Sequence, residues 1–261
     1  MAAKIEEYAM IGDCRTAALV SLTGSIDWLC LPRFDSMACF AGIVGTSGNG
    51  RWRIAPVNTR YTASRTYLDG SLILRTRFQT EDGAVELTDF MPVEQENSHI
   101  VRMITCSEGS VSLESELLVR FDYGLTPPWI RKTDDRTTTM ISGPDLLVLR
   151  SELATDITDE KVTATFDVHK GDKFIFILSH GPSHLPPPST IEPERLFQRT
   201  KAWWKGWSGR CEEAGRWTEI VRRSLITLKG LTYVPTGGII AAPTTSLPEC
   251  IGSSRNWDYR Y

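Results

Sequence analysis

Residues 1 to about 185 alternate between apolar and polar side chains in short runs that are separated by turn residues. In SLILRTRFQTEDGAVELTDFMPV, every second residue shares a face on either side of Asp82-Gly83, a dipeptide typical of tight hairpins. Further turn signals stand at Thr23-Gly24, Glu108-Gly109 and Gly171-Asp172. Helical periodicity is nearly absent from this segment. The pattern therefore predicts a mostly β fold, a large antiparallel β-sandwich.

Three consecutive prolines at positions 186 to 188 mark a change in composition. Such a run forms a stiff, extended spacer, and the residues after it have helical periodicity. Pro193 stands near the first turn of the expected helix, where proline is tolerated, and Ser189 or Thr190 is the expected cap. We therefore expect a β-domain over residues 1–185 and a proline-rich, then helical linker over residues 186–210.

A second helix is predicted from Trp217 onward, in WTEIVRRSLITLKGLTY, and Pro235 is expected to end it. Apolar residues at helical spacing form a stripe along about four turns. The stripe consists of Trp217, Ile220, Val221, Leu225, Leu228 and Leu231. Two helices do not form a core of their own, so the stripe must pack on the β-domain or associate with a partner.

Composition narrows the class of protein. A net charge of −3 and a pI near 5.9 give no electrostatic footprint for nucleic acid. No apolar run approaches the ~18 residues of a membrane span, and Glu6 and Glu7 stand where a secretory signal would be basic. The six cysteines lack CxxC spacing, which indicates reduced thiols and no metal site. We expect a cytoplasmic protein with no cofactor, no nucleic-acid partner and no membrane partner.

The stretch from residue 13 to residue 35 is one candidate for binding chemistry. It interleaves charged residues and a tryptophan with glycines and cysteines, namely Asp13, Arg15, Asp27, Trp28, Arg33 and Asp35. One interpretation is a loop that lines a ligand. The favoured interpretation is a structural loop with a buried Arg–Asp pair and with Trp28 in the core. GxSxG, P-loop and GxGxxG motifs are absent, which counts against serine hydrolases and nucleotide-binding enzymes.

The last residues combine aromatic and charged side chains: Trp257, Asp258, Tyr259 and Arg260. Aromatic faces stack on the C–H faces of a pyranose, and charged planar groups hydrogen-bond its hydroxyls, so this set suits a sugar site. The alternative is that the rings pack in a core and Arg260 forms a surface ion pair. Composition alone leaves both interpretations open.

Several blocks together resemble the family-15 glycoside hydrolases, the glucoamylase and trehalase-like enzymes. They are IGDCRTAALVSLTGSIDWLCLPRFDSMACF, DFMPV, RFDYG, RSLITLKGLTYVPTGGIIAAPTTSLPE and RNWDYRY, in that order. The resemblance implies an N-terminal β-sandwich, a helical linker and an (α/α)6 barrel, whose first helix and loop would occupy residues 211–261. It also implies inverting hydrolysis of α-glucosidic bonds by two carboxyl groups, which stand roughly 6.5–9.5 Å apart in such enzymes.

The same resemblance places Tyr259 at the subsite for the terminal glucose, with Trp257, Asp258 and Arg260 in the same substrate-binding motif. Gly252-Ser253-Ser254 departs from the pattern, because many relatives have a second glycine there. Both catalytic glutamates would lie beyond Tyr261. We therefore expect no catalytic residue here, a truncated chain that is inactive alone, and trehalose or another α-glucoside as substrate of the full-length enzyme.

Two alternatives remain open. In the first, the chain is a non-catalytic module that binds carbohydrate or a partner protein and self-associates through the exposed helices. In the second, the chain is part of a phosphorylase with the same sandwich-plus-barrel plan.

Overall fold

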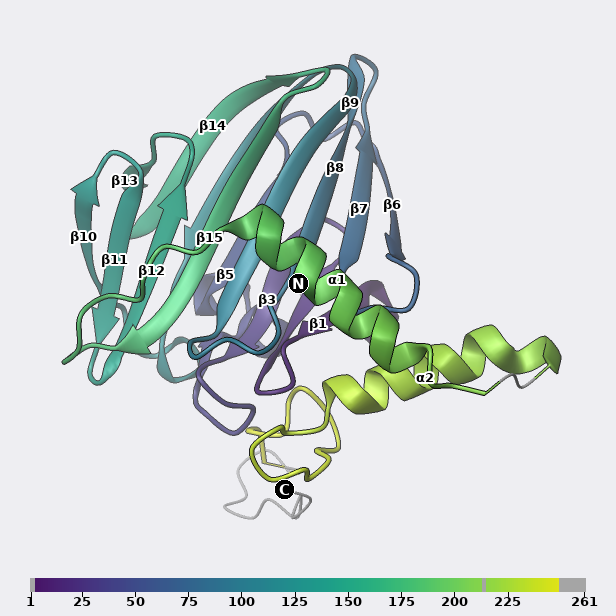
Figure 1. Ribbon diagram of the computed structural model, residues 1–261. Helices are drawn as coiled ribbons and strands as arrows, with labels where there is room; N and C mark the ends of the chain where they lie inside the picture. Colours follow the sequence, from purple (N-terminus) through teal and green to yellow (C-terminus); the bar gives the residue numbers. More distant parts are fainter. Residues whose placement is uncertain (1–2, 213–214, 249–261) are drawn as a thin grey trace.

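One long strand, β9 (His99–Leu118), takes part in both sheets of the protein (Figure 1). The computed structural model describes residues 3–212 and 215–248. The first half of β9 pairs with β8 (Gly83–Phe90) and β15 (Lys173–Pro182), and its second half with β5 (Arg51–Pro56) and β14 (Lys161–His169). The two sheets are therefore continuous through one strand and enclose a shared apolar core.

We name the sheets the N-terminal sheet and the helix-covered sheet. The N-terminal sheet has the order β1 (Tyr8–Gly12), β2 (Ala17–Ser21), β3 (Ser25–Cys30), β5, β9, β14 and β13 (Asp156–Thr158), with β4 (Ala38–Phe40) beside β3. The helix-covered sheet has the order β6 (Thr62–Tyr67), β7 (Leu74–Gln79), β8, β9, β15, β12 (Asp145–Ser151), β11 (Thr137–Ser142) and β10 (Trp129–Asp134). Short 3-10 turns lie at Ile5–Glu7, Gly42–Val44, Ser47–Asn49, Asp122–Gly124 and Gly215–Trp217. The predicted antiparallel β-sandwich is confirmed.

Strand β7 illustrates how the alternating pattern forms the sandwich. Leu74, Thr76 and Phe78 are buried, whereas the arginines between them are only partly covered. This period of two is that of a strand with one face on a core. The predicted turns at Asp82-Gly83 and Thr23-Gly24 join β7 to β8 and β2 to β3.

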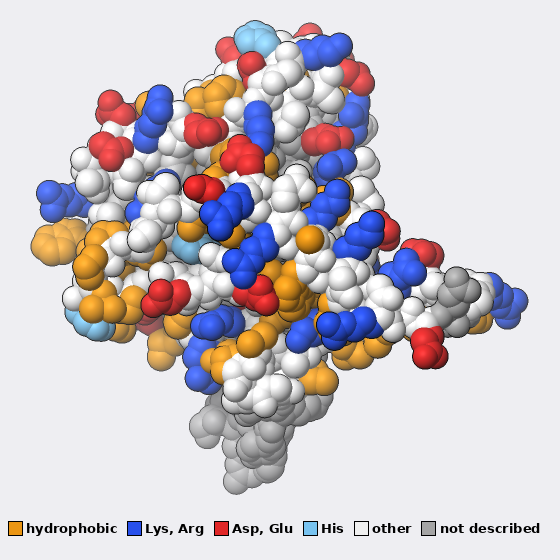
Figure 2. All heavy atoms as spheres, in the orientation of Figure 1, with side chains coloured by type: hydrophobic (Ala, Val, Ile, Leu, Met, Phe, Trp, Pro, Cys, Tyr) orange, Lys and Arg blue, Asp and Glu red, His pale blue; other side chains and the backbone are white. Residues whose placement is uncertain are grey.

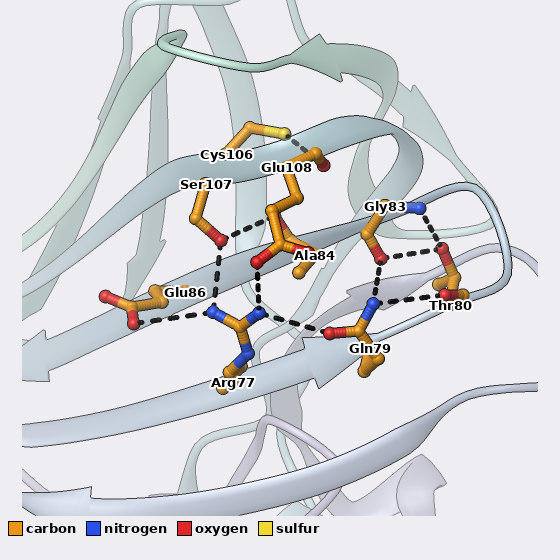
Figure 3. Close-up of polar contacts among 9 residues, drawn as sticks. All are labelled: Arg77, Gln79, Thr80, Gly83, Ala84, Glu86, Cys106, Ser107 and Glu108. Carbon is orange, nitrogen blue, oxygen red and sulfur yellow. Dashed lines mark hydrogen bonds and ion pairs between the residues drawn. The ribbon is translucent and has the colours of Figure 1, made fainter.

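The expected turn at Glu108-Gly109 is wrong, because β9 continues through these residues as one strand. Gly109 has φ +62° and lies opposite Gly83, where β8 begins. Figure 3 shows Arg77 of β7 reaching across β8 to Ser107 and Glu108, with hydrogen bonds of 3.1 Å to each. Ser107 is an extra residue in the pairing of β9 with β8, beside this left-handed glycine. Such a bulge bends its strand, here where β9 passes from one sheet to the other.

The turn at Gly171-Asp172 is present, but its two flanking strands do not form a hairpin. β14 pairs with residues 110–117 of β9 in the N-terminal sheet, and β15 pairs with residues 99–105 in the helix-covered sheet. Lys170 and Gly171 donate backbone hydrogen bonds to Gly109 and Cys106 of β9, respectively. The turn thus crosses between the sheets at the point where β9 itself crosses.

Arg102 lies between the two sheets and is fully buried. Its guanidinium binds Asp89 of β8 through Nε and Nη2, at 2.8 and 3.2 Å. Nη1 and Nη2 also donate to the backbone carbonyls of Trp52 and Gly24, each at 2.7 Å, and the indole ring of Trp52 lies 5.0 Å away. This buried Arg–Asp pair joins β8 and β9 and is not the pair that the sequence predicted, which was expected between residues 13 and 35.

Helix α1 (Pro193–Ser208) lies across the outer face of the helix-covered sheet (Figure 1). Phe197 meets Phe90 of β8 edge to face at 5.5 Å, and Trp204 is fully buried. Pro193 is the first helical residue, as expected, but neither Ser189 nor Thr190 is the cap. A residue before proline is driven out of the helical region, so the extended Glu192 takes the cap position.

Helix α2 (Thr218–Gly230) ends before Pro235, because Thr232 pairs with Ile239 as the chain turns back. The predicted stripe docks only in part: Trp217, Ile220 and Leu228 are exposed, whereas Leu231 is buried. Ile226 and Gly230, which lie outside the stripe, are the buried residues of the helix itself. A Cβ at Gly230 would lie 2.5 Å from Leu72 Cδ1, so the absent side chain permits close packing on the β-domain.

Arg223 completes this docking face one turn earlier. It donates to the carbonyl of Ser71 at 2.9 Å and lies 4.1 Å from the ring centre of Tyr67. No helix in the described residues has the length and apolar character needed to cross a membrane.

We predict that Arg102→Met destabilises the chain by about 3–5 kcal/mol, because it leaves Asp89 buried without its partner. Arg77→Met makes the same replacement at a partly exposed arginine and should cost about 1 kcal/mol or less. Urea unfolding followed by circular dichroism measures both. Equal losses would contradict a dominant role for the buried pair.

A second prediction concerns the bend of β9. A Cβ at Gly109 would lie 1.9 Å from the carbonyl oxygen of Asp82, whereas one at Gly143, with φ +56°, would meet nothing within 4 Å. Gly143→Ala should therefore cost only the ~1–2 kcal/mol of a left-handed alanine, and Gly109→Ala about 3 kcal/mol or more. Thermal melts of the two variants compare them directly, and a melting temperature no lower for Gly109→Ala than for Gly143→Ala would refute the steric argument.

Candidate functional site

The segment after α2 folds back over the loops of the N-terminal sheet. The amide of Val234 donates to the carbonyl of Cys14 at 2.9 Å, and Tyr233 meets Phe34 edge to face at 6.2 Å. The guanidinium of Arg33 lies 5.0 Å from the ring centre of Tyr233. The described residues that lead toward position 249 are thus held by the β-domain.

Three side chains of the β-domain bind the part of this segment between Pro243 and Ser246. Trp28 Nε1 donates to the carbonyl of Pro243 at 2.8 Å, and the hydroxyl of Tyr123 donates to the carbonyl of Ser246 at 3.1 Å. Cys30 Sγ lies 3.3 Å from the hydroxyl of Ser246. We call Trp28, Cys30 and Tyr123 the clamp.

The sequence positions these three groups in two ways. Trp28 and Cys30 are two residues apart on β3, so they share a face of the strand. Tyr123 follows β9 in a short turn, and its ring lies 6.3 Å from that of Trp28. Leu247 packs against the same buried cluster.

The turn that carries Tyr123 is strained. Asp122 and Tyr123 have φ of +52° and +59°, a left-handed conformation that is uncommon for residues other than glycine. Thr126 Oγ1 donates to the Asp122 carboxylate at 2.7 Å, and Asn49 donates to the Tyr123 carbonyl at 3.4 Å. Strain of this kind persists only where surrounding contacts enforce it, and it gathers at functional sites.

The clamp acts through neutral groups. Burial raises the pKa of the Cys30 thiol to about 12 and also raises the pKa of the Tyr123 hydroxyl. A thiol with so high a pKa carries no thiolate at neutral pH and is a poor nucleophile. The clamp therefore positions the backbone of the segment, and its Cys30 thiol does not serve as a nucleophile.

The charged residues of the N-terminal stretch support the structural interpretation. Asp13 is buried, accepts hydrogen bonds from the backbone of Arg15 and Thr16 and from Ser98, and has its pKa raised by burial. Asp27 accepts hydrogen bonds from Tyr8 and Ser25. Asp13 thus orders the loop that follows β1, and Asp27 links β3 to β1.

Arg33 and Asp35 form an ion pair of 2.8 Å whose side chains are about half exposed, so it is not the buried Arg–Asp pair that was expected in this stretch. Within residues 3–212 and 215–248, no cluster of three His, Cys, Asp or Glu side chains is arranged to hold a metal.

The substrate-binding residues predicted from the sequence, Trp257, Asp258, Tyr259 and Arg260, lie outside the described residues. Their roles remain predictions. Sequence reasoning did not single out Tyr123 or Ser246 for the site, because their partners are more than a hundred positions away. The one local signal is RFDYG, in which a glycine follows Asp122 and Tyr123 and favours a tight turn.

Comparison with known proteins gives consistent matches. Residues 1–204 match the family described as trehalase-like, N-terminal. The trehalase of Mycolicibacterium smegmatis is 33% identical over 286 aligned positions, which include 98% of this chain and 42% of that protein. Trehalase 1 of Sulfolobus acidocaldarius is 34% identical, over 98% of this chain and 43% of that protein. The chain thus spans less than half the length of these relatives.

A solved structure shares the fold. A bacterial glucoamylase complexed with acarbose matches with a TM-score of 0.65 at 12% identity, over 93% of this chain and 43% of the glucoamylase chain. The family match over residues 1–204 confirms the glucoamylase and trehalase-like assignment that the sequence blocks indicated. The chain therefore belongs to the trehalase-like N-terminal family.

Proposed function

We propose that this chain forms the N-terminal region of an inverting α-glucosidic hydrolase of the trehalase or glucoamylase type. The observation that carries the proposal is the clamp, which fixes the backbone of Pro243 and Ser246 shortly before the aromatic and charged residues at positions 257–260. The relatives in which this region recurs are named trehalases. The β-domain would act by positioning the polypeptide that enters the sugar site.

The proposed organisation has three parts. Residues 1–185 form the β-sandwich domain, residues 186–210 the linker, and residues 211–261 the start of an (α/α)6 barrel. Inverting glycosidases require a general acid and a general base on opposite faces of the sugar. We place both carboxylates in the part of the relatives that this chain does not span, so that the chain contributes to substrate binding and not to proton transfer.

In the proposed site, Tyr259 lines the subsite for the terminal glucose, and Trp257, Asp258 and Arg260 hold its ring and hydroxyls. A pyranose offers apolar C–H faces to aromatic rings and hydroxyls to charged planar groups. The substrate is accordingly trehalose or another α-glucoside.

A second candidate function is supported by α2. Three residues of its apolar stripe, Trp217, Ile220 and Leu228, are exposed in the described chain. Exposed apolar surface of this kind favours association with another protein surface. The chain would then serve as a binding module whose partner covers the stripe.

We predict that the 261-residue chain alone releases no glucose from trehalose or maltose. Joined to the remaining portion of the M. smegmatis trehalase in place of that protein's own N-terminal region, it should support hydrolysis. Proton NMR of the first product identifies the anomer, and inversion at an α-linkage requires β-glucose. A phosphate-dependent reaction that yields glucose 1-phosphate would contradict hydrolysis and favour the phosphorylase.

The positioning role of the clamp predicts an effect on catalysis that exceeds the effect on stability. Tyr123→Phe removes one hydroxyl that binds the Ser246 carbonyl, and a lost neutral hydrogen bond of about 1 kcal/mol corresponds to roughly fivefold. We expect kcat/KM of the joined enzyme to fall by about that factor.

Tyr61→Phe is the matched control, because it deletes the same atom from a ring that packs on Phe78, away from the clamp. It should leave kcat/KM unchanged. If the two variants have the same kcat/KM, or if Tyr123→Phe acts only by lowering the melting temperature, the clamp does not position the substrate site.

A further inference from the structure

A groove of about 700 Å³ lies at the outer edge of the helix-covered sheet. Its floor is formed by β10 and β11 with Leu146 of β12, and its wall by the linker after β15. The residues that line it are Trp129, Ile130, Arg131, Thr133, Thr139, Ile141, Leu146, Ser183, Leu185 and Pro187. Its volume is that of a small-molecule site. Figure 2 shows hydrophobic side chains gathered on the side of the molecule where Figure 1 places β10 and this linker.

Trp129 is the unusual residue of this groove, since 83% of it is exposed. Trp28, Trp52 and Trp204 are completely buried. Trp217 is also exposed, at 53%, but the guanidinium of Arg216 lies 4.7 Å from its ring centre. Within the described part of the chain, no ring or cation contacts Trp129. Its indole face is therefore available to a ligand.

Polar side chains lie beside the exposed indole of Trp129 in this groove. Trp129 and Arg131 are two positions apart on β10 and share one face of the strand. Thr133 follows at an irregularity in the pairing with β11, and all three side chains are exposed and line the groove. Arg131 lies opposite Thr139 on β11, and Trp129 lies opposite Ile141. Among the described residues, the guanidinium of Arg131 makes no ion pair, which leaves its donors free.

This arrangement fits a sugar better than it fits a lipid, because an acyl chain offers no partner to Arg131 and Thr133. A pyranose presents an apolar face to an indole and a rim of hydroxyls to neighbouring donors and acceptors. Along β10, the ring of Trp129 can stack on the apolar face of a sugar, and the nearby polar groups of Arg131 and Thr133 can bind its hydroxyls.

We propose that this groove binds a neutral oligosaccharide, with Trp129 stacked on a pyranose ring and with Arg131 and Thr133 hydrogen-bonded to its hydroxyls. The site shares no residue with the clamp, and it is built on the other sheet. It goes beyond the proposed function, because it would hold carbohydrate without transforming it. Only the choice of α-glucosides as first probes rests on that function.

The experiment is isothermal titration of the 261-residue chain with maltotriose and trehalose, and with cellotriose as a probe that does not depend on the proposed function. We expect at least one of these sugars to bind with a Kd at or below ~10 mM. Trp129→Ala should weaken that binding about tenfold or abolish it. Arg131→Met, which keeps the bulk of the side chain but removes its donors, should weaken binding severalfold.

Trp217→Ala is the matched control, because it removes an exposed indole elsewhere and should leave the Kd unchanged. Circular dichroism melts verify that each variant is folded. The proposal is overturned if no sugar binds, if Trp129→Ala binds as tightly as the parent chain, or if Trp217→Ala weakens binding equally. It is also overturned if Trp129→Ala abolishes self-association in sedimentation while no sugar binds. Binding that requires Trp129 supports the groove whether or not the joined enzyme hydrolyses α-glucosides.

Discussion

The buried guanidinium of Arg102 fixes the position of one sheet relative to the other. It reaches from β9 to Asp89 within the helix-covered sheet and to the carbonyls of Trp52 and Gly24 in the N-terminal sheet. A charge in this environment is tolerated only when it is paired and its donors are satisfied. Because Gly24 lies in the turn that leads into β3, the same contact orients the strand that carries Trp28 and Cys30. The clamp therefore depends on an interaction inside the sandwich.

Sequence reasoning predicted the sandwich because alternation and turn residues are local signals. It failed at Gly109 and at Gly171 for one shared reason: a turn propensity says where the chain bends and not which strands pair afterwards. At Gly109 the bend stays within β9, and at Gly171 the two strands join different sheets. Both positions lie where β9 crosses between sheets, and that crossing is a non-local feature.

Local sequence signals were also insufficient to predict how α2 docks and which residues form the clamp. Periodicity found the helix and its apolar stripe, but the face that docks is set by Gly230, whose missing side chain is a feature of packing and not of hydrophobicity. Arg223 contributes to docking although it is charged, because its donor reaches the carbonyl of Ser71. For the clamp, Trp28 was predicted to be buried, yet its bond to Pro243 spans most of the chain. No local pattern encodes such a contact.

The chemistry of the clamp explains what kind of positioning it provides. Trp28 and Tyr123 bind main-chain carbonyls, so they hold the path of the segment whatever side chains it carries. Both donors are neutral and Cys30 keeps its proton, so this hold does not change with pH near neutrality. A proline at 243 donates no backbone hydrogen bond of its own, which leaves its carbonyl as the group to recognise. The β-domain thus fixes the course of the backbone at Pro243 and Ser246. In the proposed function, the residues at positions 257–260 would remain free to determine which sugar is bound.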